Sequence, residues 1–191
     1  MGRKAQHRSA LLRATQNLLR QKGYLAMGVA DILRASGAPR GSLYHHFPEG
    51  KVALAAEAVR VEGETVRRHL LRLMQDHPTP EAFFAAYAAR LGAWMAASDF
   101  RDGCPLATVM LETASEDPPL QQAGQAAFAS WLSVFSALFA RAGLPPEAAQ
   151  RRALQSLAII EGALLLARVQ QSTVPLATLI PACGRLSLDA A

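Results

Sequence analysis

The chain has 191 residues, of which 51% are hydrophobic and 18% are charged, and its formal net charge is +5. This composition allows one or two domains with a sizeable core and excludes disordered and collagen-like chains. Two cysteines, Cys104 and Cys183, are too few for a disulfide framework. No run reaches the roughly 18 uninterrupted apolar residues of a membrane span, and the N-terminal sequence lacks the apolar core of a signal peptide. We therefore expect a folded cytoplasmic protein that has no membrane partner.

Positive charge is concentrated at the start of the chain. The first 60 residues contain ten basic and three acidic side chains, whereas the rest of the chain contains ten basic and twelve acidic ones. A basic head on a nearly neutral body is typical of proteins that bind the phosphate backbone of nucleic acids. The alternative interpretation is a basic face that is only solvated.

Three helices are predicted in the basic segment. Leucines recur at helical spacing from Ser9 to Lys22, and Gly23 ends that run. Two short helices follow, from about Val29 to Ser36 and from about Pro39 to Phe47, with the proline at a position that suits a helix start. Both are too short to be stable alone, so they need the first helix to pack against.

A tight turn at Gly37 separates the second and third predicted helices. Glycine readily takes the left-handed conformation that commonly ends a helix. Helix, tight turn and helix is the arrangement in which the second helix enters the major groove of DNA while the first crosses the backbone. The segment from Ala38 to Phe47 is therefore the expected recognition helix.

The remainder of the chain is predicted to be helical as well. A long helix starts at Lys51 and carries an apolar stripe from the small domain into the larger one. Breaks with proline or glycine then separate further helices over about 79–97, 105–115, 119–142, 146–171 and from 174 onwards. Thr79 is the expected N-cap of the first of these helices, and Pro181 is expected to kink or end the last one. Because strand-like alternation is nowhere sustained, we expect an all-α fold, with residues 1–50 as a helix-turn-helix DNA-binding domain and residues 51–191 as a helical body.

The segment from about Gly23 to Ala58 resembles the TetR family of bacterial transcriptional regulators. The resemblance is carried by L-Y-H-H-F at Leu43–Phe47 and by the lysine that follows at Lys51. Three motifs are similar to those of the LmrA/YxaF-like branch of that family. They are F-P-E-G-K at Phe47–Lys51, G-C-P-L at Gly103–Leu106 and E-G-A-L-L-L-A-R at Glu161–Arg168. The resemblance implies a three-helix DNA-binding domain followed by a ligand-binding and dimerisation domain.

Arg40, Gly41 and Ser42 are expected to stand closest to the DNA. Arginine near the N-terminus of a recognition helix is the usual bidentate partner of guanine, although Arg40 could equally contact a phosphate. Gly41 lowers helix stability by roughly 1 kcal/mol relative to alanine, which suggests that DNA approaches closely there.

Further contacts to the DNA backbone are expected around these residues. By resemblance, the Tyr44 hydroxyl contacts a phosphate, with His45 or His46 nearby; adjacent helical histidines diverge, so no metal site is expected. Lys51 should meet a phosphate at the start of the long helix. The family usually has Thr or Ser where Met27 and Gly28 stand, so only backbone N–H groups near Gly28 are expected to serve there. Arg3 and Lys4 form either a minor-groove arm or a solvated tail.

The helix over 146–171 is apolar almost all round, which indicates a partner surface. Together with the final helix it is expected to form a four-helix bundle in a homodimer, matching a palindromic operator; burial within one chain is the alternative. Glu161 should pair with an arginine or touch ligand. The expected interface residues are Leu157, Glu161, Leu164, Leu165, Arg168, Leu176, Leu179 and Ile180.

A pocket for a small hydrophobic or aromatic effector is expected in each body, although core packing explains each candidate residue as well. Cys104 is either a small buried residue or a redox-sensing or ligand-gating thiol. The candidate lining residues are Tyr87, Leu91, Trp94, Met95, Cys104, Met110, Phe128, Trp131, Leu132 and Phe135.

The function expected from these patterns is a ligand-released homodimeric repressor of the TetR type that binds double-stranded DNA. The alternative is an architectural DNA-binding dimer that responds to no ligand. An enzyme is not expected, because the sequence contains no paired histidine or carboxylate motif, no nucleotide loop and no metal-ligand spacing. No cofactor or metal is expected either.

Overall fold

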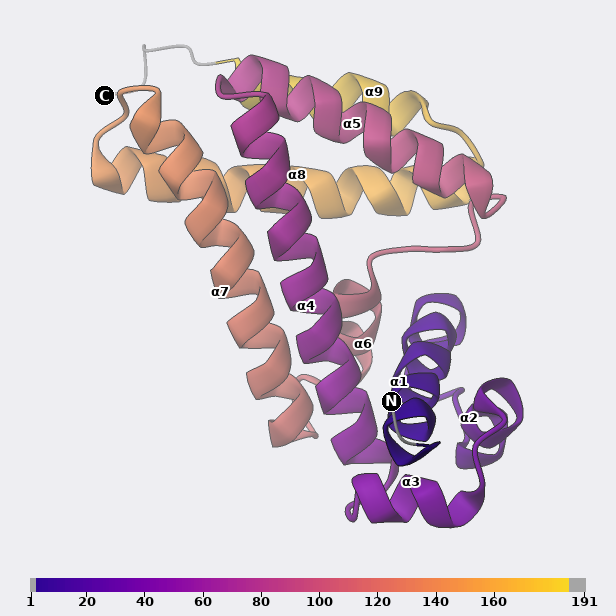
Figure 1. Ribbon diagram of the computed structural model, residues 1–191. Coiled ribbons are helices and arrows are strands. Elements are labelled where there is room, and N and C mark those ends of the chain that lie inside the picture. Colours follow the sequence, from indigo (N-terminus) through magenta and orange to yellow (C-terminus); the bar gives the residue numbers. More distant parts are fainter. Residues whose placement is uncertain (1–2, 186–191) are drawn as a thin grey trace. The chain divides into compact units, whose positions relative to one another are not determined.

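The computed structural model describes residues 3–185 of the chain, and the side chains of residues 5–185. The regular elements of this part are all helices (Figure 1). They are α1 (Arg3–Lys22), α2 (Val29–Ser36), α3 (Arg40–His46), α4 (Lys51–Asp76), α5 (Pro80–Ala97), α6 (Pro105–Thr113), α7 (Pro118–Arg141), α8 (Pro146–Gln170), α9 (Val174–Leu179) and the short 3₁₀ helix η1 (Pro181–Gly184). The prediction of an all-α fold is confirmed.

The described chain forms two compact units. The first comprises residues 3–64 and 104–128, which include α1, α2, α3 and α6. The second comprises residues 65–103 and 129–185, which include α5, α8 and α9. Helices α4 and α7 contribute to both units, and residues 3–50 lie wholly in the first.

The helix starts differ from the sequence-based prediction at two places. Helix α1 begins at Arg3, well before the predicted Ser9. Pro39 has an extended backbone with ψ of 146°, so it stands just outside the recognition helix, which begins at Arg40. Two other predictions are confirmed: Thr79 Oγ1 accepts a hydrogen bond from the N–H of Ala82 at 3.3 Å, and the last α-helix ends before Pro181.

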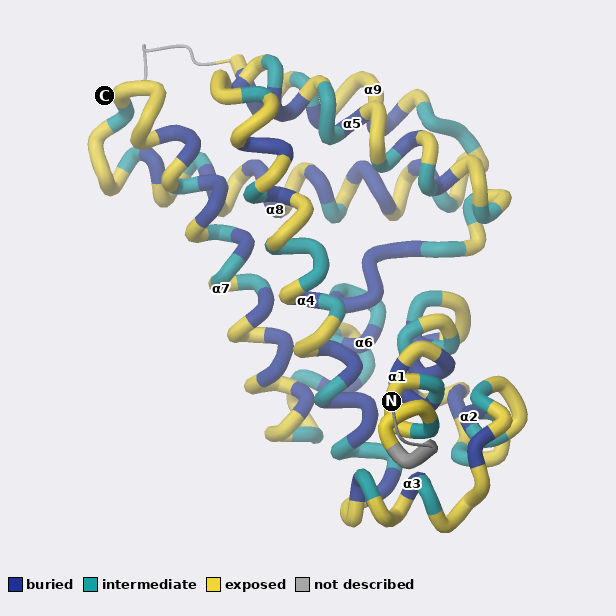
Figure 2. The backbone as a smooth tube through the Cα atoms, in the orientation of Figure 1, coloured by how far each residue is buried: buried dark blue, intermediate teal, exposed yellow. Residues whose placement is uncertain are grey.

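The core of the first unit is built from the apolar sides of its short helices. Leu11 of α1, Ile32 of α2 and Leu43 of α3 are fully buried, together with Met27 and Leu54. Figure 2 shows the buried and exposed stretches alternating along these helices. Helices of seven and eight residues gain little stability from their own hydrogen bonds, so this shared core is what holds α2 and α3 in place.

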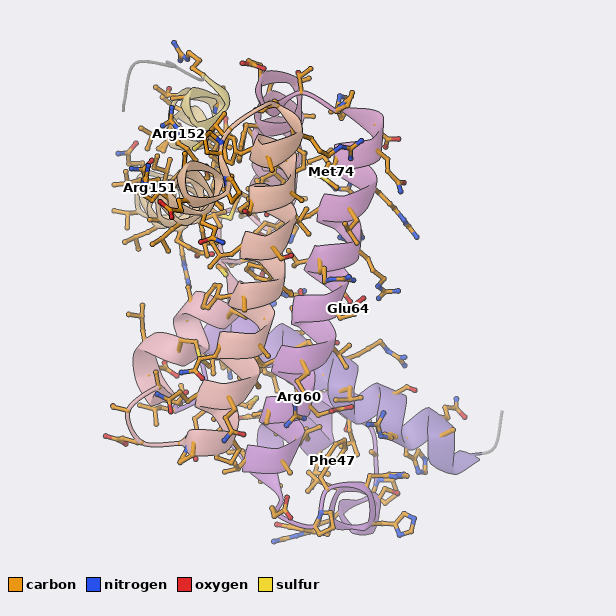
Figure 3. The ribbon with its side chains drawn as sticks, turned by 90° about the vertical axis from the view of Figure 1, so that its left-hand side faces the viewer. Phe47, Arg60, Glu64, Met74, Arg151 and Arg152 are labelled. Atoms are coloured by element: carbon orange, nitrogen blue, oxygen red, sulfur yellow. The ribbon has the colours of Figure 1, made fainter. Side chains whose placement is uncertain are left out.

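Two carboxylates of α4 fasten it to α1. Glu57 accepts hydrogen bonds from Arg8 at 2.7 Å and from Arg60 at 3.0 Å. Burial tends to raise the pKa of Glu57, but the hydrogen bonds and charges of these arginines outweigh it and lower the pKa. The Arg8 guanidinium also lies 5.6 Å from the centroid of the Phe47 ring, and Figure 3 shows Phe47 close to the start of α4. About one turn further along α4, the carboxylate of Glu62 likewise accepts hydrogen bonds from side chains of α1.

A cluster of four phenylalanines forms the core of the second unit. Phe83 and Phe84 of α5 pack against Phe135 of α7, with ring centroids 6.0 and 5.7 Å apart. Phe84 stacks on Phe139 at 5.7 Å. All four rings are buried, so α5 and the second half of α7 are fixed to each other by aromatic packing.

Two helices, α7 and α8, are long and apolar enough to cross a membrane by length and composition alone. Helices of a packed protein core meet the same criterion. In α8, buried Ile160 and exposed Leu165 both add to the hydropathy. The helix is therefore apolar on its inner and its outer side.

A buried hydroxyl in α1 provides a test of this packing. Thr15 is fully buried, and its Oγ1 has no hydrogen-bond partner within the described part of the chain. We expect Thr15→Val to raise the free energy of unfolding by about 1 kcal/mol, because an unsatisfied polar atom is removed at constant shape. Chemical denaturation followed by circular dichroism measures the change.

Thr113→Val is the matched control for this prediction. Thr113 is also a buried helical threonine of the first unit, but its Oγ1 donates to the carbonyl of Val109 at 2.8 Å. Its replacement should give no gain in stability. A Thr15→Val variant that is less stable than the parent protein would contradict the prediction.

Candidate nucleic-acid interface

The turn between α2 and α3 is shaped by Gly37. Its φ of +63° is in the left-handed region, and its N–H donates to the carbonyl of Leu33 at 3.0 Å. The N–H of the next residue, Ala38, donates a hydrogen bond to the Ser36 hydroxyl at 3.2 Å. The predicted helix, glycine turn and helix is therefore present, with backbone polar groups satisfied locally.

The recognition helix α3 presents one apolar and one polar side. Leu43 and Phe47 are buried, as predicted, whereas Arg40, Tyr44 and His45 are exposed. The Arg40 guanidinium lies 5.9 Å from the centroid of the Tyr44 ring. A cation held over an aromatic face is partly ordered before DNA arrives, which reduces the entropy lost on binding.

The two histidines of α3 differ in exposure. His45 is exposed and His46 is half-buried, and their rings meet edge to face with centroids 4.9 Å apart. His46 also contacts the ring of Phe47, with centroids 6.5 Å apart. His46 therefore packs against the protein, and contact of His45 with DNA stays a prediction.

The fold itself does not require a glycine at position 41. A Cβ placed on Gly41 would meet no atom within 4 Å, and its φ is not in the positive range that favours glycine. Glycine in a helix lowers stability by about 1 kcal/mol relative to alanine. The described part of the fold therefore gives no reason for glycine at this exposed position.

Ser42 is engaged by α1, which sequence reasoning did not foresee. Its hydroxyl lies 3.0 Å from Nδ1 of His7, at a partly buried position. The contact fixes α3 to the start of α1 and competes with direct contact of Ser42 to a base edge. The side chains of Arg3 and Lys4, expected as a minor-groove arm or a solvated tail, lie outside the residues whose side chains are described.

The start of α2 has no side-chain N-cap, as expected from Met27 and Gly28. The Gly28 N–H, expected to face a phosphate, donates instead to the carboxylate of Asp31 at 3.1 Å. This hydrogen bond is the main cause of the lowered pKa of Asp31, and the charges of Lys22 and Arg34 act in the same direction. Phosphate binding at Gly28 would therefore have to displace an acidic side chain of the protein.

Lys51 begins α4, as predicted, but its ammonium group is not free in solution. Its Nζ lies 4.0 Å from the centroid of the Tyr24 ring. Burial lowers the pKa of Lys51, while the carboxylates of Glu112 and Asp117 oppose that effect. Burial and the charge of Asp117 likewise raise the pKa of Tyr24. The lysine expected to meet a phosphate thus belongs to a small cluster of charged and aromatic groups.

Glu112 of α6 is a member of this cluster that sequence reasoning missed. Its Oε2 accepts hydrogen bonds from the N–H groups of Tyr24 at 2.5 Å and Leu25 at 3.0 Å. These residues form the turn between α1 and α2. A single acidic residue in an apolar helix gives no signal of such a contact.

The residues expected at a dimer interface divide into two groups. Leu157, Leu164, Leu176 and Ile180 are buried within the chain itself, the last two completely, so they have little or no surface left for a partner. Leu165 and Leu179 are exposed, and Glu161 and Arg168 are half-buried. Further exposed apolar residues of α8 lie on the same outer side: Leu154, Ile159, Leu166 and Val169.

The residues expected around an effector are mostly packed. In the second unit Met95, Trp131 and Phe135 are buried, and Tyr87, Leu91 and Trp94 are half-buried. In the first unit Met110 and Phe128 are half-buried. Buried Cys104 caps α6, since its Sγ accepts from the N–H of Ala107 at 3.5 Å. An open depression of about 630 Å³ between α7 and α8 is lined by one of the candidate residues, Leu132, and by residues that were not predicted, such as Leu154.

A helix-turn-helix in the basic N-terminal segment of 60 residues defines a DNA-binding regulator, and the comparisons with known proteins agree. Residues 11–58 match the family of bacterial regulatory proteins called the tetR family, and residues 80–180 match the C-terminal domain of LmrA/YxaF-like transcriptional regulators. The chain belongs to the TetR family, in its LmrA/YxaF-like branch.

Individual relatives are similar over most of their length. An HTH-type transcriptional regulator of Mycobacterium tuberculosis is 34% identical over 164 residues, covering 83% of this chain and 82% of the relative. The HTH-type transcriptional regulator LmrA of Bacillus subtilis is 31% identical over 169 residues, covering 88% and 90%. The crystal structure of regulatory protein TetR from Rhodobacter sphaeroides has a TM-score of 0.82 at 25% identity, covering 93% of this chain and 96% of the other.

Proposed function

We propose that the protein is a homodimeric repressor that binds a palindromic operator and releases it when a small hydrophobic or aromatic molecule binds the helical body. The observation that carries the proposal is the outer side of α3. Arg40, Tyr44 and His45 are exposed there beside Gly41, whose small size the fold does not need. Exposed polar side chains on a helix anchored by its opposite side are what base readout in a major groove requires.

The outer side of α8 supports a dimer. Leu154, Leu165 and Val169 are 61%, 63% and 74% exposed, although each is apolar. Several exposed apolar side chains on one helix are typical of a protein–protein interface. A second copy is the occupant that we propose, because a twofold dimer presents two recognition helices to the two halves of a palindrome.

Release by a ligand requires the ligand to favour a state of the dimer that fits DNA less well. The half-buried aromatic side chains of the second unit, Tyr87 and Trp94, are suited to an apolar or flat ligand. Few charged groups stand among the candidate residues, which favours a neutral effector over an anion.

The base-reading and phosphate-binding roles make different predictions. We expect Arg40→Ala to relax base preference at one position of each half-site, since the lost contact is to a base edge. Lys51→Ala should weaken binding to all sequences alike and lower the salt dependence by about one phosphate contact per subunit. Fluorescence anisotropy on selected and scrambled duplexes over a salt series measures both.

Arg141→Ala is the control for this pair, because Arg141 is an exposed arginine at the end of α7 in the second unit. It should leave both base preference and salt dependence unchanged. Identical behaviour of the Arg40 and Lys51 variants would contradict the assignment of separate roles.

The dimer prediction concerns the exposed leucines. We expect Leu165→Arg to convert the dimer into a folded monomer and to lower operator affinity by at least tenfold, because one half-site alone then supplies the binding energy. Leu111→Arg is the matched control, since Leu111 is 89% exposed but lies on α6. Sedimentation velocity gives the oligomeric state; a dimeric Leu165→Arg protein would argue against this surface.

The effector prediction uses the tryptophans. The chain contains two, and both Trp94 and Trp131 are candidate pocket residues. We expect planar hydrophobic compounds that release operator DNA to quench tryptophan fluorescence with the same concentration dependence. Operator release without a change in fluorescence would place the effector elsewhere, and operator binding insensitive to a broad panel would favour the architectural alternative.

A further inference from the structure

One carboxylate of α6 holds the turn that leads into the helix-turn-helix. Oε2 of Glu112 accepts hydrogen bonds from two successive backbone N–H groups, those of Tyr24 at 2.5 Å and Leu25 at 3.0 Å. The partners are 88 and 87 residues apart in the chain. Hydrogen bonds to an ionised acceptor are roughly twice as strong as neutral ones, so this contact fixes the turn firmly.

The turn is shaped to admit the carboxylate. Gly23, the residue before Tyr24, has a φ of +77°, and a Cβ at this position would lie 2.8 Å from Cδ of Glu112. Both the backbone conformation and the lack of space favour glycine. The turn and the carboxylate therefore fit each other closely.

The same turn carries the ring on which Lys51 rests. Nζ of Lys51 lies 4.0 Å from the centroid of the Tyr24 ring, and the charges of Glu112 and Asp117 act on this lysine. Displacement of Glu112 would release the turn, shift the ring and change the surroundings of the ammonium group. Three features of the proposed DNA interface adjoin this contact: the entry to α2, the ring of Tyr24 and the ammonium group of Lys51.

We propose that Glu112 is a positioning residue for operator binding: by clamping the α1–α2 turn, it makes the affinity for DNA depend on the position of α6. The inference rests on the proposed function and adds the regulation of the same site. Any event that withdraws α6 from the turn lowers operator affinity, with no change in the residues that touch DNA.

The direction of the change in DNA affinity distinguishes a positioning role of Glu112 from a simple effect of its charge. Removal of a negative charge from a DNA-binding protein should by itself strengthen its binding to DNA, because less repulsion opposes the phosphates. Loss of a positioning contact should weaken binding to the operator. The two effects oppose each other, so the direction of the change identifies which one Glu112 exerts.

The experiment compares Glu112→Ala and Glu112→Gln in the full-length protein. We expect Glu112→Ala to lower affinity for an operator duplex about tenfold, as loss of hydrogen bonds to a charged acceptor implies. Glu112→Gln retains one acceptor oxygen and should lose only about threefold. Hydrogen exchange should show faster exchange at the Tyr24 and Leu25 amides, more so in the alanine variant.

Glu116→Ala is the control, because Glu116 is an exposed acid just beyond α6. Its affinity for the operator should be equal to or higher than that of the parent protein, with unchanged exchange at Tyr24 and Leu25. Binding of all variants to a scrambled duplex should change far less than binding to the operator.

Equal or stronger operator binding by a folded Glu112→Ala dimer overturns the proposal, as does unchanged exchange in the turn. If the alanine variant does not fold, the glutamine variant decides by the same two measurements. A parent protein that binds no DNA site specifically would refute the proposed function and this inference together. Specific binding by the parent with no Glu112 effect would refute this inference alone.

Discussion

The structure of the DNA-binding unit depends on burial of the inner sides of two very short helices. Seven- and eight-residue helices are unstable in water, so α3 and α2 exist because Leu43 and Ile32 are completely buried against α1 and its neighbours. That burial fixes which side of α3 remains outside. The polar side chains of α3 face away from the unit because the apolar side of the helix is packed inside. They do not themselves form part of the core.

The unit is then oriented by polar contacts that join distant parts of the chain. Glu57 and Glu62 fasten α4 to α1, Glu112 fastens α6 to the α1–α2 turn, and His7 meets Ser42. Each contact uses a side chain that is only partly buried, so the interactions are strengthened without the full desolvation penalty of a buried ion. These contacts join α1, α3, α4, α6 and the α1–α2 turn to one another.

Short sequence patterns predicted the features that depend on interactions between residues close together in the chain. Gly37, the proline breaks and the leucine spacing were sufficient for the helices and for the buried side of α3. The contacts of Ser42 and Glu112 join residues 35 and 88 positions apart, which no periodicity or capping rule reports. In α8, leucines occur on every side, so spacing could not separate Leu164, which packs inside the chain, from Leu165, which is exposed. The aromatic candidates were ambiguous for the same reason, because core and pocket use the same residue types.

Gly41 has a consequence for how variants of this protein are selected. The helix would gain stability from an alanine there, and no atom of the described residues stands within 4 Å of the added methyl group. Selection for thermal stability alone would therefore enrich a substitution at the surface that we propose to face DNA. If that proposal holds, screening for stability and screening for operator binding would favour different residues at this position.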